Sequence, residues 1–160
     1  MTTLYTTDLS GNYREATHDE ILDAARQQLA RRIRRGARLE TPRMTRDFLT
    51  VRLGARDHEV FTVLFLDNRH RLIEVTEMFR GTLDGASVHP REVVKAALTH
   101  NAAAVILAHN HPSGVAEPSA ADELITHRLK DALALVDVRI LDHVIIAGGE
   151  ALSFAERGLL

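Results

Sequence analysis

Hydrophobic positions along the chain follow two patterns, one typical of helices and one typical of buried strands. Apolar residues at helical spacing predict helices at about 17–35, 90–101 and 119–136, and a further short helix is expected at about 45–58. Because these helices alternate with strands, we expect an α/β fold with a mixed sheet covered by helices on both faces. Runs rich in apolar and β-branched residues predict the strands at Val60–Leu66, Arg71–Phe79, Ala103–Ala108 and Val138–Ala147.

The order of these elements divides the chain into an extension and a larger domain. Thr17 and Glu20 form a pattern typical of a capping box, which predicts the start of the first helix. The segment before Thr17 is short, polar and unpatterned. Pro42 marks a break after that helix. We therefore expect an N-terminal extension with an arginine-rich helix at residues 1–44 and one larger domain at residues 45–160.

Composition narrows the chemistry that the chain can perform. A chain of 160 residues with 45% hydrophobic residues can bury one respectable core. A formal net charge of -2 and a pI of about 6.5 give no global basic field that would indicate nucleic acid as the main partner. The absence of cysteine excludes disulfides, thiolate zinc sites and thiol nucleophiles, so any metal must be held by histidine and carboxylate.

Targeting signals are not recognisable in the sequence. The N-terminus has no charged region followed by an apolar stretch, and no run approaches the roughly 18 apolar residues that a membrane span requires. These features predict a cytoplasmic protein with no membrane partner.

Arginines gather at the end of the first predicted helix. One interpretation is a contact with nucleic acid or another acidic partner, and the other is a solvated helix end whose cations complement the helix dipole. We favour the second interpretation. The same amphipathic helix can pack on its own domain or on a neighbouring copy, which would make the protein a homodimer. The arginines are Arg31, Arg32, Arg34, Arg35 and Arg38.

Two histidines and an aspartate follow the predicted central strand, Ala103–Ala108. His109 and His111 are two residues apart, so both imidazoles can project to the same side of a chain that is leaving the sheet. Ser119 is placed to cap the next helix, which puts Asp122 in its first turn, facing the histidines. Two imidazoles and one carboxylate fill three positions of a tetrahedral zinc and leave the fourth for water, a pattern typical of catalytic sites. The sequence therefore predicts one zinc ion per chain.

Five short motifs carry a resemblance to a known family. They are His109-x-His111-Pro112, Ser119-x-x-Asp122, Phe79-Arg-Gly-Thr82, Pro90-Arg-Glu-Val-Val94 and Ser153-Phe-Ala-Glu-Arg-Gly158. In combination they resemble the JAMM/MPN metallohydrolases, most closely the RadC-like JAB domains of bacteria, over about Arg46 to Leu160. The resemblance implies a three-layer α-β-α fold similar to that of cytidine deaminases. It also implies a zinc metallopeptidase that hydrolyses amide or isopeptide bonds of a peptide or protein substrate.

The resemblance also implies two catalytic side chains. The family's glutamate lies at the end of a helix that leads into the first core strand, which in this sequence points to Glu59 as the general base. The family's serine is matched by Ser119, which would stabilise the developing oxyanion together with the zinc. Glu59 could instead be an ordinary exposed acid near a helix end. Its rivals for the catalytic role are Asp57, Glu74 and Glu77.

Other polar residues near the motif have less specific assignments. Asn110, Ser113 and Gly114 are expected to line the substrate groove, because the loop that carries the ligands must border that groove. His143 either supports a metal ligand or closes a strand, and we favour the second interpretation.

Alternative functions are kept beside the hydrolase. The domain could hold its metal as structure and act as a non-catalytic scaffold, although scaffold relatives of this kind usually lose a ligand. It could serve as a DNA-repair accessory protein, which predicts salt-dependent DNA binding through the arginines. The histidines could also merely cap their strand while Asp122 acts only as a first-turn partner of the helix dipole, but Ser119 alone already caps that helix. An HNH nuclease and a zinc deaminase are excluded because their residue patterns are absent.

Overall fold

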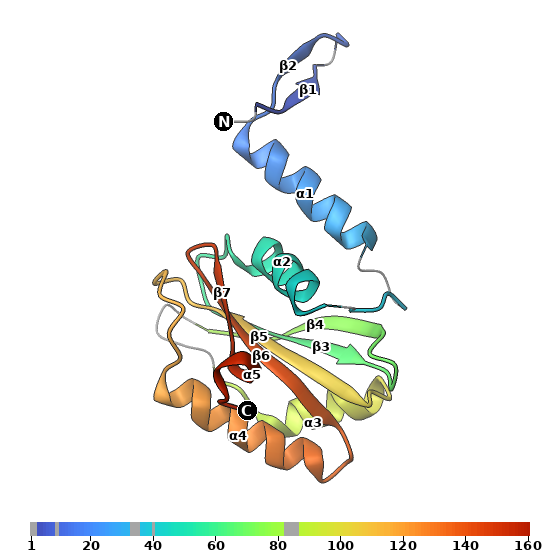
Figure 1. The fold of residues 1–160 in the computed structure, drawn as a ribbon, viewed down its shortest axis with the longest axis vertical. Coiled ribbons are helices and arrows are strands. Elements are labelled where there is room, and N and C mark those ends of the chain that lie inside the picture. Colours follow the sequence, from blue (N-terminus) through green and yellow to red (C-terminus); the bar gives the residue numbers. More distant parts are fainter. Residues whose placement is uncertain (1–2, 9, 33–35, 40, 82–86) are drawn as a thin grey trace. The chain divides into compact units, whose positions relative to one another are not determined.

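Residues 1–32 form the first of two structural units, and residues 33–160 form the second. Both are seen in a computed structural model, which describes residues 3–8, 10–32, 36–39, 41–81 and 87–160 (Figure 1).

The first unit consists of a hairpin and a helix. Strands β1 (Tyr5–Thr7) and β2 (Tyr13–Glu15) pair in antiparallel register, and α1 follows at His18–Arg32. The predicted capping box is confirmed, because the Glu20 N–H donates to the Thr17 hydroxyl while the Thr17 N–H donates to the Glu20 carboxylate. The hairpin differs from the expected unpatterned segment, since strands of three mostly polar residues give no alternation for a sequence pattern to detect.

The predicted arginine cluster lies mostly outside the described part of the chain. Arg34 and Arg35 fall outside it, as do the side chains of Arg31 and Arg32. Arg38 is exposed and forms an isolated antiparallel bridge with Arg71. The interpretation of this cluster therefore stays a prediction.

The second unit contains four helices and five strands within the described residues. Apart from α2, the predicted elements lie within two residues of the observed ones. In chain order the elements are α2 (Pro42–Leu53), β3 (Val60–Leu66), β4 (Leu72–Arg80), α3 (Pro90–Thr99), β5 (Ala104–Asn110), α4 (Ala120–Ala134), β6 (Arg139–Ala147), β7 (Glu150–Ser153) and α5 (Phe154–Arg157).

Helix α2 is shifted toward the N-terminus relative to the expected 45–58. Thr41 caps it by accepting a hydrogen bond from the Met44 N–H, and Pro42 occupies its first turn, where a missing N–H costs nothing. The helix ends at Leu53, and Gly54 follows it. Pro42 therefore starts a helix instead of marking a break. The expected domain boundary between residues 44 and 45 falls inside α2, and the units divide after Arg32 instead.

The five strands of the second unit form one mixed sheet in the order β4-β3-β5-β6-β7. Strands β3 and β4 form an antiparallel hairpin, and the predicted central position of β5 is confirmed. Strands β5 and β6 are parallel and are joined through α4, whereas the other neighbours are antiparallel. The C-terminal end of β5 and the N-terminus of α4 therefore meet at one end of the sheet, where parallel α/β folds place their sites.

Helices cover both faces of this sheet, which makes the second unit a three-layer α/β structure. Helix α2 lies on one face, and α3 and α4 lie side by side on the other (Figure 1). The larger core cluster fills the space under α3 and α4, and its centre is formed by Phe61, Leu107, Leu129 and Leu133. Ile125 packs against this cluster, whereas Leu124 is 61% exposed, because adjacent helix residues point about 100° apart.

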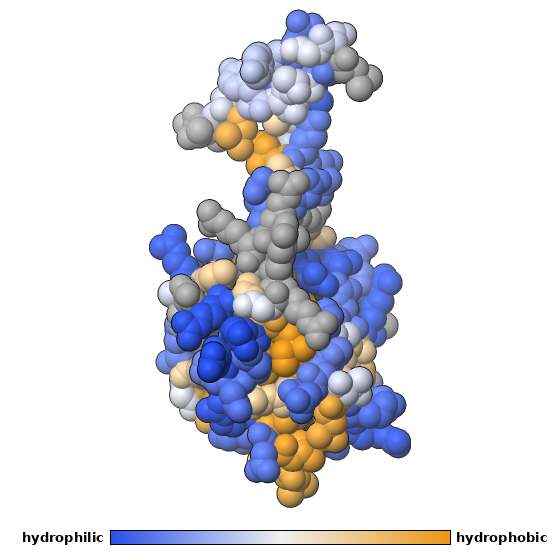
Figure 2. Space-filling view, turned by 90° about the vertical axis from the view of Figure 1, so that its right-hand side faces the viewer, coloured by the Kyte–Doolittle hydropathy of each residue, from blue (hydrophilic) through white to orange (hydrophobic). Residues whose placement is uncertain are grey.

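The surface of the second unit is mixed. In Figure 2 its hydrophobic residues lie between hydrophilic ones on the face shown. The exposed large hydrophobic residues described in this unit are Leu98, Val115, Leu124 and Leu135. None of the described helices has both the length and the apolar character that crossing a bilayer would require.

Candidate metal centre

The predicted ligands converge because strand and helix geometry aim them at one point. Val105 and Leu107 of β5 pack in the core under α3 and α4, and His109 is the next residue on the same face. His111 follows directly after β5, and its N–H still donates to the Ile146 carbonyl of β6 at 2.9 Å. Asp122 is the third residue of α4, whose N-terminus faces this end of the sheet.

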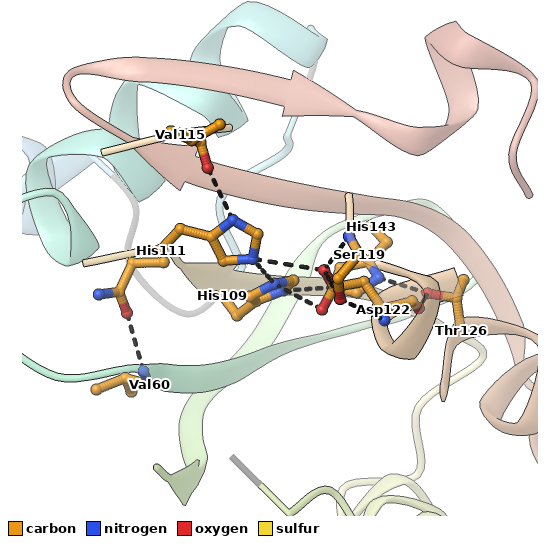
Figure 3. Close-up of polar contacts among 9 residues, drawn as sticks. Val60, His109, His111, Val115, Ser119, Asp122, Thr126 and His143 are labelled. Carbon is orange, nitrogen blue, oxygen red and sulfur yellow. Dashed lines mark hydrogen bonds and ion pairs between the residues drawn. The ribbon is translucent and has the colours of Figure 1, made fainter. Parts of the chain in front are cut away.

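The three side chains meet closely enough to hold one metal ion. One nitrogen or oxygen from each of them lies within 4.8 Å of the others. His109 Nε2 lies 2.9 Å from His111 Nε2 and 3.1 Å from Asp122 Oδ1, and His111 Nε2 lies 3.4 Å from Asp122 Oδ2 (Figure 3). His109 is 1% exposed, whereas the side chains of His111 and Asp122 are 16% and 13% exposed. The site is therefore closed on the His109 side and reachable from solvent on the other.

Ser119 fixes the direction of Asp122. The Ser119 N–H and hydroxyl both donate to Asp122 Oδ2 at 2.7 Å, and the Asp122 N–H donates back to the hydroxyl at 3.1 Å. This is a capping box at the start of α4, as the sequence predicted for Ser119. With one oxygen held by Ser119, the carboxylate still presents Oδ1 to His109. The contacts assign Ser119 an orienting role, and its predicted contact with a substrate oxyanion stays a prediction.

The second nitrogen of His111, Nδ1, is hydrogen-bonded within the loop that follows His111. His111 Nδ1 lies 2.8 Å from the Val115 carbonyl oxygen. A carbonyl oxygen can only accept, so Nδ1 carries a proton, and the neutral form of the ring therefore has its lone pair on Nε2, on the side of Asp122 and His109. This is the tautomer that a metal ligand requires.

A chain of three side chains gives His109 the same tautomer. Thr126 donates its only hydroxyl proton to the Asp122 carbonyl at 2.6 Å, so its oxygen must accept from His143 Nδ1, also at 2.6 Å. His143 Nε2 is then an acceptor, and it lies 2.8 Å from His109 Nδ1. His109 therefore carries a proton on Nδ1, and the neutral form of its ring has the lone pair on Nε2. Figure 3 shows these contacts in one view.

Burial and hydrogen bonding set the charges of the site. Burial alone would raise the pKa of Asp122, but the hydrogen bonds that Nε2 of His109 and of His111 donate when these rings are protonated outweigh it and hold that pKa well below its usual range. The hydrogen bond to Asp122 raises the pKa of His111 above its ordinary value, and the negative charge of Glu59 adds to this effect. Complete burial holds the pKa of His143 well below its usual range, so His143 is neutral at physiological pH.

Glu59 is partly buried at the edge of the site. It is the residue immediately before β3, not the last residue of a helix, because α2 has already ended at Leu53. Its charge acts on His111, which places the carboxylate in the electrostatic range of the ligands. Among its rivals, Glu77 is bound to Arg52 and Arg56. The catalytic assignment of Glu59 stays a prediction.

The other two rivals are also placed elsewhere. Asp57 is 92% exposed on its side chain and pairs with His58. Glu74 pairs in register with Phe65 toward the far end of β3, and its carboxylate accepts from the adjacent Val75 N–H. Neither contact joins these acids to His109 or His111.

Sequence reasoning misjudged two residues around the ligands. His143 does not close a strand, because it lies in the middle of β6, is fully buried and contacts His109. A histidine inside an otherwise apolar buried strand needs a polar partner, and this signal could have identified it. Asn110 does not line a groove, because it is 2% exposed and its amide is bonded to the backbone around Glu59.

The loop after His111 borders a surface hollow of about 390 Å³. Gly114 lies in its wall, together with Val115 and residues 150–153 of β7. Ser113 is exposed beside it. The expectation that Ser113 and Gly114 border a substrate groove stays a prediction.

Comparison with known proteins adds the family context. The RadC-like JAB domain family matches residues 39–159. A UPF0758 protein of Nitrosococcus oceani is 66% identical over 139 residues, which are 87% of this chain and 62% of that protein. UPF0758 proteins of Thioalkalivibrio sulfidiphilus and Marinobacter nauticus are 61% and 58% identical over 150 residues, 94% of this chain and 67% of each relative. The chain thus spans about two thirds or less of these relatives, and their names state no activity.

Proposed function

The chain belongs to the RadC-like JAB domain family, and we propose that it is a zinc-dependent hydrolase of amide or isopeptide bonds in a peptide or protein substrate. The observation that carries this proposal is the convergence of His109, His111 and Asp122, whose ligand atoms lie within 4.8 Å of one another. Both imidazoles present Nε2 to that point because their Nδ1 atoms are engaged elsewhere.

The donor set fits a catalytic zinc. Two histidines and one carboxylate supply three of the four ligands that zinc prefers, and the partly exposed side chains of His111 and Asp122 leave the site open to solvent. When bound, zinc acts as a Lewis acid on a carbonyl and lowers the pKa of a water molecule to about 7. This route needs no covalent intermediate on the chain, which is consistent with the absence of Cys.

The remaining chemistry is proton transfer, which we assign to Glu59. Its carboxylate would take a proton from the attacking water and pass it to the leaving nitrogen. Two observations support this role: the Asn110 side chain, between the two candidate histidine ligands, binds the backbone on both sides of Glu59, and the charge of Glu59 acts on His111. Ser119 would turn its hydroxyl from Asp122 to the scissile carbonyl oxygen as negative charge develops there.

Zinc content and hydrolysis measured together test the proposal. Wild type, His109→Ala, Asp122→Ala and Glu59→Gln would be purified, and a panel of peptide and isopeptide substrates would be incubated with each. Two residues of α4 give matched controls. Glu123 adjoins Asp122 in the first turn, and the exposed His127 contacts only its own helix among the described residues, through the Glu123 carbonyl.

The hydrolase predicts a specific pattern across these variants. Wild type should hold one zinc ion, the two ligand variants should lose it, and Glu59→Gln should keep it while losing hydrolysis by a factor of about 10² or more. Glu123→Ala and His127→Ala should behave as wild type. Zinc binding without any hydrolysis would favour a scaffold in which the metal is structural. A wild-type protein that binds no zinc would refute the proposal.

A further inference from the structure

Asn110 stands between the two histidine ligands, and its side chain faces the backbone on either side of Glu59. Asn110 Oδ1 accepts from the Val60 N–H at 2.9 Å, and Asn110 Nδ2 donates to the His58 carbonyl at 2.9 Å. The backbone partners leave no choice in the orientation of the amide, because an N–H can only donate and a carbonyl can only accept. One side chain therefore binds the backbone on both sides of Glu59, and we call these two hydrogen bonds the bracket.

This bracket begins where the regular pairing of β3 with β5 ends. The antiparallel pairs run from Leu66 with Ala104 to Phe61 with His109. Continuing the same register would place Val60 opposite Asn110 and Glu59 opposite His111. In an extended chain the carbonyl of residue 58 and the N–H of residue 60 point to the same side, so one amide can bind both. The Asn110 side chain thus extends the pairing beyond the last backbone pair.

The same stretch of backbone is also held from the other side. The Glu59 carbonyl accepts from the Gly81 N–H, just after β4, at 2.8 Å. Asn110 is 2% exposed, so its amide has no room to exchange these partners for bulk water. Removing it would leave a buried N–H without an acceptor, and buried unsatisfied groups are costly.

We propose that Asn110 is a positioning residue that ties Glu59 to the metal ligands. Residues 109–111 place two candidate ligands and the bracket on one three-residue segment, so a single side chain links the backbone of the general base to the segment that carries these ligands. The inference rests on the proposed function for its catalytic meaning. Its structural content, the immobilisation of Glu59, can be measured without any substrate.

Amide hydrogen exchange in the protein without added metal gives the first test. In Asn110→Ala, the Val60 N–H loses its acceptor, and the Gly81 N–H, which Asn110 does not touch, reports whether Glu59 itself has been released. Both should exchange about tenfold faster or more than in wild type. Thr62→Val is the matched control, because Thr62 is buried in the same strand and its hydroxyl has no partner among the described residues. It should leave both rates unchanged.

Asn110→Asp is the second variant, and it serves if Asn110→Ala does not fold. A carboxylate can still accept from the Val60 N–H but cannot donate to the His58 carbonyl. The Val60 rate should then stay near the wild-type value while the Gly81 rate rises. Zinc content should match wild type in both Asn110 variants, because the three ligands are intact.

Kinetics with the zinc-loaded protein give the second test. Asn110→Ala should lower kcat about tenfold or more with little change in KM, since substrate contacts are unaffected. Combined with Glu59→Gln it should lower kcat no further, whereas a general structural defect would add its full factor. Wild-type exchange rates at Val60 and Gly81 in Asn110→Ala, or fully additive losses, would overturn the proposal. Faster exchange at both sites in Asn110→Ala, together with no hydrolysis by the wild type, would sustain the bracket and refute the hydrolase.

Discussion

His109 Nδ1 and His143 Nε2 lie 2.8 Å apart on the neighbouring strands β5 and β6, and both rings are buried. Thr126 on α4 completes the chain by accepting from His143 and donating to the Asp122 carbonyl. The direction of these bonds follows from the single proton of the Thr126 hydroxyl. The ligand tautomer of His109 is thus set through His143 by a threonine on α4, the helix that carries Asp122.

Thr126→Val should weaken zinc binding while preserving the size of the side chain. Without the hydroxyl, His143 has no acceptor for its Nδ1–H. It then no longer favours the tautomer whose Nε2 accepts a hydrogen bond from His109 Nδ1. Zinc affinity should fall about 10–100-fold, as for other groups that orient metal ligands. Competition with a chelator measures it. Thr99→Val is the control, because the Thr99 hydroxyl makes the same bond to its own helix, at Lys95, away from the site. Equal affinities in both variants would contradict the assigned chain.

Ser119→Ala should lower both stability and zinc affinity. It removes a helix cap, which costs about 1 kcal/mol of the free energy of unfolding, and it releases the Asp122 carboxylate. Ser153 caps α5 through the Glu156 N–H and also donates to Asp142, so Ser153→Ala is a matched loss of a cap. Thermal denaturation and chelator competition should show both proteins destabilised and only Ser119→Ala impaired in zinc binding. Unimpaired zinc binding in Ser119→Ala would mean that Asp122 needs no such support.

In the metal-free protein, the pair of His111 and Asp122 should stabilise the fold less above neutral pH than at mildly acidic pH. The pKa of His111 is raised on folding, so its contribution is complete below the unfolded value of about 6.5 and is lost as pH rises through the folded pKa. The pKa of Asp122 is lowered, so its contribution is present above about 3.9 and is lost as pH falls through the folded pKa. The pair therefore stabilises most between about pH 4 and 6.5.

Melting temperatures at pH 5.5 and 8.5 in the presence of a chelator measure this effect. Asp122→Asn should lower the melting temperature more at pH 5.5 than at pH 8.5, since it removes the partner of the protonated His111. Added zinc should stabilise the wild type more at the higher pH, because zinc competes with protons for the imidazoles. A melting temperature that rises from pH 5.5 to 8.5 by the same amount in wild type and Asp122→Asn would contradict the assignment.

DNA binding by variants of the arginine cluster tests whether nucleic acid is a partner. If it binds DNA, the logarithm of the association constant should fall linearly with the logarithm of salt concentration, with a slope near -0.9 for each phosphate contacted. Replacing Arg31, Arg32, Arg34, Arg35 and Arg38 by alanine should abolish that binding. Fluorescence anisotropy with a labelled duplex measures both. Absence of binding by the wild type at low salt would support a solvated helix end.

Local spacing in the sequence determined most of the secondary structure and which three residues are the candidate ligands. A strand residue repeats its direction every two positions, which relates His109 to His111, and an N-capped helix puts its third residue at the cap, which relates Ser119 to Asp122. These relationships span three residues at most, so neighbouring side chains alone fix them. The N-terminal hairpin and the start of α2 differ from the prediction. The strands of the hairpin have only three residues each, and Pro42 can either follow one helix or start the next.

Only the tertiary structure decided what supports those ligands. His109 and His143 are 34 positions apart, and Asn110 lies 52 positions from His58. Such contacts depend on the order and register of β3, β5 and β6, because moving a strand by one residue turns its side chains to the opposite face. The sequence therefore determined the chemical groups of the site, whereas strand pairing determined which nitrogen of His109 carries a proton and where Glu59 stands.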